Sequence, residues 1–145
     1  MLSDAVVSHP CLGSTMVTYA LRLKPGEEIV STLHRFVEDN NLGAVSILTC
    51  VGSVSRVTLR MADSTTIKTY KENCEIVSLV GTVSAGGHMH ACFSDARGDV
   101  FGGHVIGDMY VYTTAEILLG ECTGLSFTRE HCHLSGYDEL VVKKK

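Results

Sequence analysis

The apolar pattern beyond residue 44 constrains the fold more than any other feature of this sequence. Short segments rich in β-branched and apolar residues follow one another there, separated by glycine-containing turns such as Gly52-Ser53. This spacing is typical of strands in an antiparallel or mixed sheet, in which the almost wholly apolar segment 44–51 is the central strand. The predicted strands cover residues 16–23, 44–51, 54–61, 65–70 (an edge strand), 74–83, 89–95, 100–101, 113–122 and 125–133. Residues 113–122 also fit a short helix, although Ile117-Leu118-Leu119 favours a strand.

Only one segment has a convincing helical pattern. In residues 27–41, apolar side chains recur at spacings of three and four residues, which places them on one face of a helix. Glu27 and Glu28 suit the positive N-terminal end of the helix dipole, and Gly43 marks its end. The sequence therefore predicts a compact single domain of the α+β class, with a mainly antiparallel or mixed sheet and one main helix after the first strand.

Length and charge limit the classes of function. A chain of 145 residues suffices for one domain with a sizeable core. A formal net charge of -4 argues against a nucleic-acid binder that works through a basic surface. We expect an irregular leader over residues 1–15, one domain over residues 16–142, and a solvated, frayed basic tail over residues 143–145.

The cysteines and the apolar segments bear on the location of the protein. None of the 6 cysteines forms a C-x-x-C pair, and several alternate with apolar residues. This pattern predicts reduced, buried thiols rather than a disulfide framework. The sequence has neither a signal-peptide pattern nor an apolar run of the ~18 residues that a membrane helix needs. We therefore expect a cytoplasmic protein, with a nuclear location as the alternative.

Three histidines carry the most specific chemistry. Glycine pairs precede His88 and His104, and His90 follows His88 by two residues. Residues two apart in a strand point to the same face, so His88 and His90 should lie side by side, and a turn at residues 96–99 folds His104 back against them. Three converging imidazoles predict a zinc site with an open fourth position, with nickel, copper, iron or cobalt as alternatives. The structural alternative is histidines hydrogen-bonded in a core or at a subunit interface.

A carboxylate and a second histidine pair need separate interpretations. Glu116 lies among apolar residues, where a carboxylate requires a partner. It is the candidate catalytic residue, either orienting a metal-bound histidine or acting as a general base. A structural ion pair with an arginine, namely Arg22, Arg56 or Arg60, explains it equally well. The pair His131 and His133 shares one face of a strand, and a solvated pair is favoured there over a second metal site.

The sequence resembles the plants-and-prokaryotes-conserved (PPC) domain family over residues 16–142. The resemblance rests on an ordered set of segments: residues 21–28, Gly52-Ser53-Val54, residues 75–83, His88-Met89-His90, residues 98–107, Thr114-Ala115-Glu116 and residues 136–140. It implies a compact α/β sandwich that assembles as a homotrimer. In prokaryotic-type members the H-x-H and G-G-H histidines are metal ligands, which correspond here to His88, His90 and His104.

The resemblance also limits a DNA-binding role. Plant members join this domain to an AT-hook, and this chain has no Arg-Gly-Arg-Pro segment. The sequence therefore predicts a small metal-binding homotrimer of undetermined activity, with metal-hydroxide chemistry on a small molecule if the site is catalytic. The alternatives are a non-catalytic oligomerisation or protein-interaction module, and a DNA-binding regulator like the plant members. Whether the protein is an enzyme is left open, and neither DNA nor a membrane is an expected partner.

Overall fold

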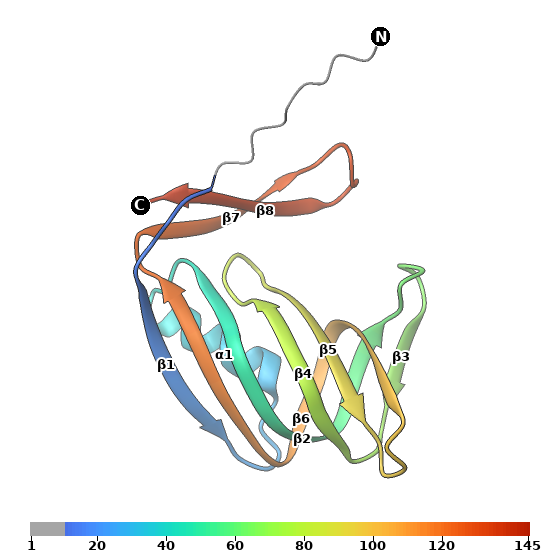
Figure 1. Ribbon diagram of the computed structural model, residues 1–145. Coiled ribbons are helices and arrows are strands. Elements are labelled where there is room, and N and C mark those ends of the chain that lie inside the picture. Colours follow the sequence, from blue (N-terminus) through green and yellow to red (C-terminus); the bar gives the residue numbers. More distant parts are fainter. Residues whose placement is uncertain (1–10) are drawn as a thin grey trace.

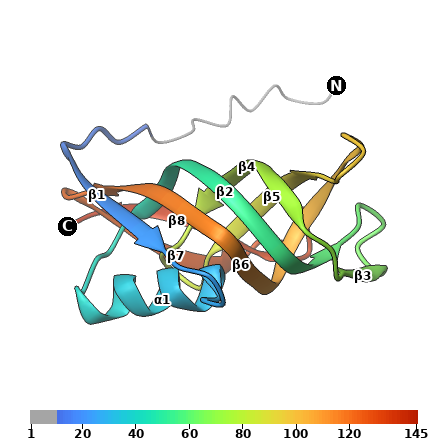
Figure 2. The same cartoon turned by 90° about the horizontal axis from the view of Figure 1, so that it is seen from below.

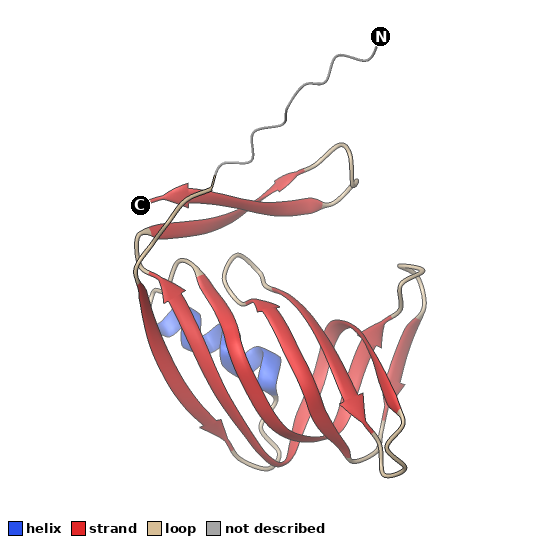
Figure 3. Ribbon diagram, viewed as in Figure 1, coloured by secondary structure: helices blue, strands red, loops and turns tan. Residues whose placement is uncertain are grey.

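The computed structural model describes residues 11–145, and residues 11–15 have no regular secondary structure (Figure 1). The rest of the predicted leader, residues 1–10, lies outside the described residues. The elements are β1 (Met16–Leu23), α1 (Ile29–Asp39), β2 (Val45–Arg60), β3 (Ile67–Tyr70), β4 (Cys74–Thr82), β5 (His88–Ser94), β6 (Val100–Cys122), β7 (Leu125–His131) and β8 (Asp138–Lys144). Residues 11–145 thus form a mainly antiparallel sheet with one helix, as predicted (Figure 3).

The main sheet closes on itself. Its strand order is β1-β6-β5-β4-β2-β3, and β6 also pairs with β2. The extra pairing completes a circuit of β2, β4, β5 and β6, in which every strand has a partner on both sides. The result is a small barrel with β1 and β3 as flanking strands, and Figure 2 shows how strongly its strands twist. The prediction of an edge strand at residues 65–70 is confirmed by β3.

Two strands are much longer than predicted. Residues 45–60 form the single strand β2, and residues 100–122 form the single strand β6, so the expected interruption at Gly52-Ser53 and the separate segments 100–101 and 113–122 were wrong. The glycines there make bulges instead of turns, since the β2–β6 register shifts near Gly52 and again near Gly107. Both strands continue because each is hydrogen-bonded to the other along most of its length.

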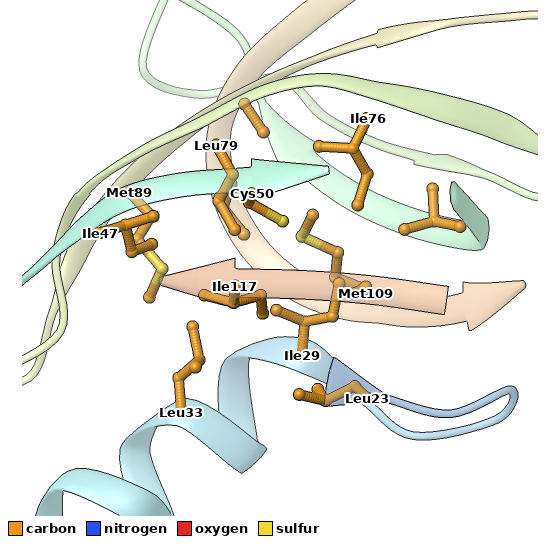
Figure 4. Packing of buried hydrophobic residues seen from close by; sticks show 14 of the residues in the cluster. Leu23, Ile29, Leu33, Ile47, Cys50, Ile76, Leu79, Met89, Met109 and Ile117 are labelled. Atoms are coloured by element: carbon orange, nitrogen blue, oxygen red, sulfur yellow. The ribbon is translucent and has the colours of Figure 1, made fainter. Parts of the chain in front are cut away.

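The helix supplies one side of the core. Its apolar residues Ile29, Leu33 and Val37 are buried, and Figure 4 shows Ile29 and Leu33 directed at Ile117 of β6. The helix is shorter at both ends than the predicted residues 27–41, because Glu28 is its N-cap and accepts a hydrogen bond from the backbone N–H of Ser31 at 2.6 Å. The other carboxylate oxygen of Glu28 accepts from the backbone N–H of Met109, which ties the helix to β6.

A hairpin of β7 and β8 lies across one end of the barrel (Figure 1). The sequence predicted β7 but not β8, and the expectation of a frayed tail was wrong because Lys143 and Lys144 belong to β8. The backbone N–H of Lys145 still donates to the carbonyl oxygen of Gly124, at 3.0 Å. Val141 and Val142 of this strand are half-buried. In the sequence they are followed directly by three lysines, which suggested a solvated end of the chain.

All 6 cysteines are unpaired, as predicted, but only Cys50 and Cys74 are buried, and the prediction of burial was wrong for the exposed Cys11. Burial raises the pKa of the Cys50 thiol to about 11, which keeps it protonated and unreactive near neutral pH. Within residues 11–145, no helix combines the length and the apolar character needed to cross a bilayer.

Candidate metal centre

The pairing of β5 with β6 brings the three predicted histidines together. His88 begins β5, and His90 lies two residues further along the same face. His104 of β6 is directly opposite His90 in the β5–β6 register, so their side chains project from the same side of the barrel wall. The turn that returns the chain to β6 lies at residues 95–99, where the sequence predicted it.

The distances fit a shared metal ion. One nitrogen from each of His88, His90 and His104 lies within 4.8 Å of the other two, and no other such cluster occurs in the described part of the chain. The Nε2 atoms of His88 and His90 are 3.3 Å apart. Two nitrogens that bind one zinc ion tetrahedrally at ~2.05 Å are separated by about 3.3 Å, so this pair already has the required spacing.

The surroundings of two of the rings favour their neutral form. Partial desolvation lowers the pKa of His88 below its usual value, and the nearby charges of His90 and Arg129 lower it further, while Glu139 opposes them. Desolvation also lowers the pKa of His104, with Arg60 as the next cause. Only neutral imidazole has a free nitrogen lone pair for a metal, so these shifts favour the ligand form.

A cavity of about 360 Å³ opens beside the histidines, between the barrel and the hairpin. His88 and His104 line it from the barrel, together with Arg60 at the end of β2. Arg129 of β7 and Glu139 of β8 line it from the hairpin. Such a cavity lies at the small end of the ~300–1,000 Å³ range of ligand sites.

Comparison with known sequences identifies the family. Residues 12–123 match the Plants and Prokaryotes Conserved (PCC) domain, the family named PPC above. The chain belongs to this family. The matched segment runs from just before β1 to the end of β6 and includes all three histidines, whereas β7 and β8 lie beyond it.

Proteins with similar sequences to this PCC-domain protein occur in bacteria and plants, and the same fold occurs in an archaeal protein. A solved Salmonella enterica protein superposes with a TM-score of 0.90 at 41% identity, covering 92% of this chain and 98% of its own. A metal-containing protein of Archaeoglobus fulgidus has the same fold, with a TM-score of 0.80 at 22% identity and coverage of 92% and 99%.

Two curated relatives are longer proteins. Bifunctional protein GlmU of Synechococcus sp. (strain JA-3-3Ab) is 38% identical over 94% of this chain, which spans 22% of its length. AT-hook motif nuclear-localized protein 8 of Arabidopsis thaliana is 29% identical over 74% of this chain, which spans 30% of its length. The PCC-domain chain thus spans about a quarter of the length of these relatives.

The structure places Glu116 away from the histidines. It lies on β6 twelve residues beyond His104, a strand contour of about 40 Å at ~3.3 Å per residue. Its side chain is exposed, and it is absent from every described cavity that the histidines line. Nor does it form an ion pair within residues 11–145, although Arg22 lies opposite it in the β1–β6 register. The structure therefore supports neither interpretation of Glu116.

Residues that the sequence did not single out surround the cavity. Arg60 was considered only as a partner for Glu116, and Arg129 and Glu139 were assigned no role. Glu139 belongs to the segment 136–140 that carried part of the family resemblance, which was the one signal available. The contribution of Arg129 depends on how the hairpin folds back over the barrel, and no spacing in the sequence encodes that contact.

The second histidine pair lies at the tip of the hairpin. The rings of His131 and His133 are 5.1 Å apart, and His131 Nδ1 is 3.5 Å from a carboxylate oxygen of Asp138. His131 and His133 are both exposed, and they do not form a three-ligand cluster with any described residue. The solvated pair favoured from the sequence agrees with this arrangement.

Proposed function

We propose that this PCC-domain protein binds a zinc ion through His88, His90 and His104. The convergence of three imidazole nitrogens within 4.8 Å on an open surface supports the proposal most strongly. Neutral nitrogen donors suit zinc, and nickel, copper, iron and cobalt share this preference. The Archaeoglobus fulgidus protein with the same fold is described as metal-containing, which is consistent with such a site on this fold.

The open side of the cluster favours a role in the chemistry of a small molecule. A zinc ion with three histidine ligands lowers the pKa of a bound water to about 7 and polarises oxygen atoms of a substrate. Two carboxylates line the cavity with His88 and His104, the exposed Asp138 and the half-buried Glu139, and Glu139 replaces Glu116 as the proposed proton acceptor. Arg60 and Arg129 line the cavity as well and add positive charge to it.

We also propose that the protein forms a homotrimer. Met16 of β1, Leu48 of β2 and Leu118 of β6 expose 49%, 46% and 41% of their surface. Both the Met16 sulfur and a Leu48 methyl group lie over Gly120, two residues from Leu118, so the three side chains share one face. An apolar patch of this kind suits burial against another copy of the chain. The change Leu118→Glu should yield monomers in light scattering coupled to gel filtration.

Metal analysis tests the zinc proposal directly. Untagged protein should contain close to one zinc per chain by inductively coupled plasma mass spectrometry, and His88→Ala/His90→Ala should contain almost none. The double change His131→Ala/His133→Ala is the matched control, because it removes another H-x-H pair and should leave the zinc content unchanged. Wild-type protein that takes up no metal after incubation with zinc would contradict the proposal.

Two other functions are tested with the same proteins. If the histidine variant loses zinc and the trimer dissociates, the metal is structural and the protein is an oligomeric interaction module. A DNA-binding regulator, as the names of the plant relatives suggest, requires binding to duplex DNA at low salt. The net charge of -4 and the lack of an Arg-Gly-Arg-Pro segment predict weak binding at most.

A further inference from the structure

Two arginines flank the histidine cluster from opposite sides. Arg60 lies directly opposite His104 in the β2–β6 register, so their side chains share a face. Arg129 reaches down from β7 and donates a hydrogen bond to Thr82 Oγ1 at 3.3 Å. Thr82 in turn lies opposite His88 in the β4–β5 register. One guanidinium is therefore next to each end of the cluster, and both line the same cavity.

Neither guanidinium forms an ion pair with a carboxylate of the described residues. Arg60 and Arg129 are half-buried, yet no carboxylate within the described chain lies within 4.0 Å of either one. By contrast, the exposed Arg97 contacts Asp95 at 2.8 Å. Holding two partly desolvated cations beside a cluster of cation-binding imidazoles is unfavourable unless an anion joins them. The arrangement is suited to a ligand that brings negative charge.

Glu139 sets a second requirement for the ligand of this cavity. Its half-buried carboxylate lines the same cavity as the two arginines and His88. A carboxylate repels the oxyanion of a ligand but accepts a hydrogen bond from a hydroxyl or amino group. A ligand that satisfies all three side chains therefore carries an oxyanion and a neighbouring hydrogen-bond donor.

We propose that this cavity binds a small organic oxyanion that carries a hydroxyl or amino group, with its charged end between Arg60 and Arg129 and its donor group on Glu139. The planar fork of a guanidinium matches the two oxygens of a carboxylate, and it also fits a phosphoryl group. The inference rests on the proposed function in one respect: the ligand lies beside the proposed zinc ion, which adds to its affinity. The arginines themselves bind the oxyanion with or without the metal.

Titrations followed by NMR test this proposal in zinc-loaded and in metal-free protein. L-lactate should bind, propionate should bind more weakly because it lacks the hydroxyl, and the neutral lactamide should not bind measurably. Each of Arg60→Gln and Arg129→Gln should weaken lactate binding roughly tenfold to a hundredfold, the range for a lost hydrogen bond to a charged group. Arg35→Gln on α1 is the matched control, because Arg35 is exposed and does not line the cavity.

Two further variants keep the result interpretable. Arg60→Lys retains the charge without the fork, so a folded Arg60→Lys protein should bind lactate with intermediate affinity. Glu139→Gln should reduce the difference in binding affinity between lactate and propionate. Inorganic phosphate is the second probe: if it binds more tightly than lactate and depends on both arginines, the site is retained and its ligand is a phosphoryl compound.

The outcomes separate this proposal from the zinc proposal. Arginine-dependent lactate binding in a protein that takes up no metal would support the oxyanion site and contradict the zinc site. Stoichiometric zinc together with equal lactate affinity in wild type, Arg60→Gln and Arg129→Gln would overturn the oxyanion site and leave the zinc site intact.

Discussion

The barrel and the β7–β8 hairpin hold the side chains around the cavity in different ways. The three histidines stand on β5 and β6, which are hydrogen-bonded to partner strands on both sides. Arg129 and Glu139 stand on β7 and β8, which pair only with each other among the described strands. The relative positions of the histidines thus follow from the register of a closed sheet, whereas those of Arg129 and Glu139 depend on how the hairpin is attached.

The attachment of the hairpin consists of a few specific contacts. The backbone N–H of Phe127 donates to the carbonyl oxygen of Gly43 at 2.9 Å, and Lys145 Nζ lies 3.5 Å from a carboxylate oxygen of Glu121. The hydrogen bond from Arg129 to Thr82 is a third contact. Segments with few tertiary contacts open locally at a lower free energy than the core. We therefore expect changes in the barrel to affect stability and metal binding, and changes in the hairpin to affect mainly the oxyanion.

The largest difference between the barrel and the hairpin is expected in the stability lost when one glycine of each is replaced by alanine. Gly81 in the barrel has a φ of +131°, and a side chain there would overlap the carbonyl oxygen of His88. Gly136 in the hairpin has a φ of +80°, and no atom lies within 4 Å of an added Cβ. Gly81→Ala should lower the free energy of unfolding by at least about 3 kcal/mol, since the paired backbone must move. Gly136→Ala should cost only the left-handed conformation, about 1–2 kcal/mol.

Urea denaturation measures both free energies of unfolding in the metal-free protein, which excludes any contribution from a bound ion. Equal losses in the two variants would show that the hairpin is as rigidly built as the barrel, and the contrast between the two regions would then be wrong.

The next largest difference between the barrel and the hairpin is expected in how substitutions change the affinity for zinc. His104→Ala removes a proposed ligand and should raise the zinc dissociation constant at least ~100-fold, the upper range for loss of a residue that only orients a ligand. Arg129→Gln should change it less than tenfold and towards tighter binding, because a positive charge near the cation is removed. Competition with a fluorescent chelator measures both constants. A comparable loss of zinc in Arg129→Gln would make the hairpin part of the metal site.

The sequence predicted the histidine cluster because strand geometry is local. Alternation over two residues places His88 beside His90, and the turn at residues 95–99 returns the chain with His104 opposite His90. Both relations depend on residues close together in the chain. The same reasoning succeeded for α1, whose buried face repeats every four residues.

Glu116 shows where the same reasoning fails. Its apolar neighbours were interpreted as burial, but successive residues of a strand face opposite sides, so Ile117 is buried while Glu116 is exposed. Arg129 and Glu139 were missed for a different reason. They come to the cavity through a contact between β7 and β4, elements more than 40 residues apart whose pairing leaves no periodic pattern. The length of β6 was missed because Gly107 and Asp108 resemble a turn and form a bulge.

Acidification should destabilise the barrel of the metal-free protein. Because the pKa values of His88 and His104 are lowered in the folded state, the unfolded chain binds more protons below its own histidine pKa of about 6.5. Stability should therefore fall as the pH drops from 7.5 to 5.5, by less than about 1.4 kcal/mol per pH unit for each histidine, the limit for one proton. Urea denaturation at both pH values should show a smaller decrease in His88→Gln/His104→Gln than in wild type. The same decrease in both proteins would show that His88 and His104 do not cause the loss of stability.

The smallest expected effect concerns the hairpin alone. Lys143 Nζ lies 2.9 Å from a carboxylate oxygen of Glu130, and both side chains are more than half exposed. An exposed ion pair of this kind contributes about 0.2–1 kcal/mol, and 1 M salt, at which the Debye length is about 3 Å, weakens it strongly. Lys143→Ala should therefore speed amide hydrogen exchange in β7 and β8 severalfold at low salt, leave the exchange of β2 and β6 unchanged, and lose its effect at 1 M salt. If the change instead speeds exchange throughout β2 and β6, the hairpin and the barrel unfold as one cooperative unit, and Arg129 and Glu139 are held as firmly as the histidines.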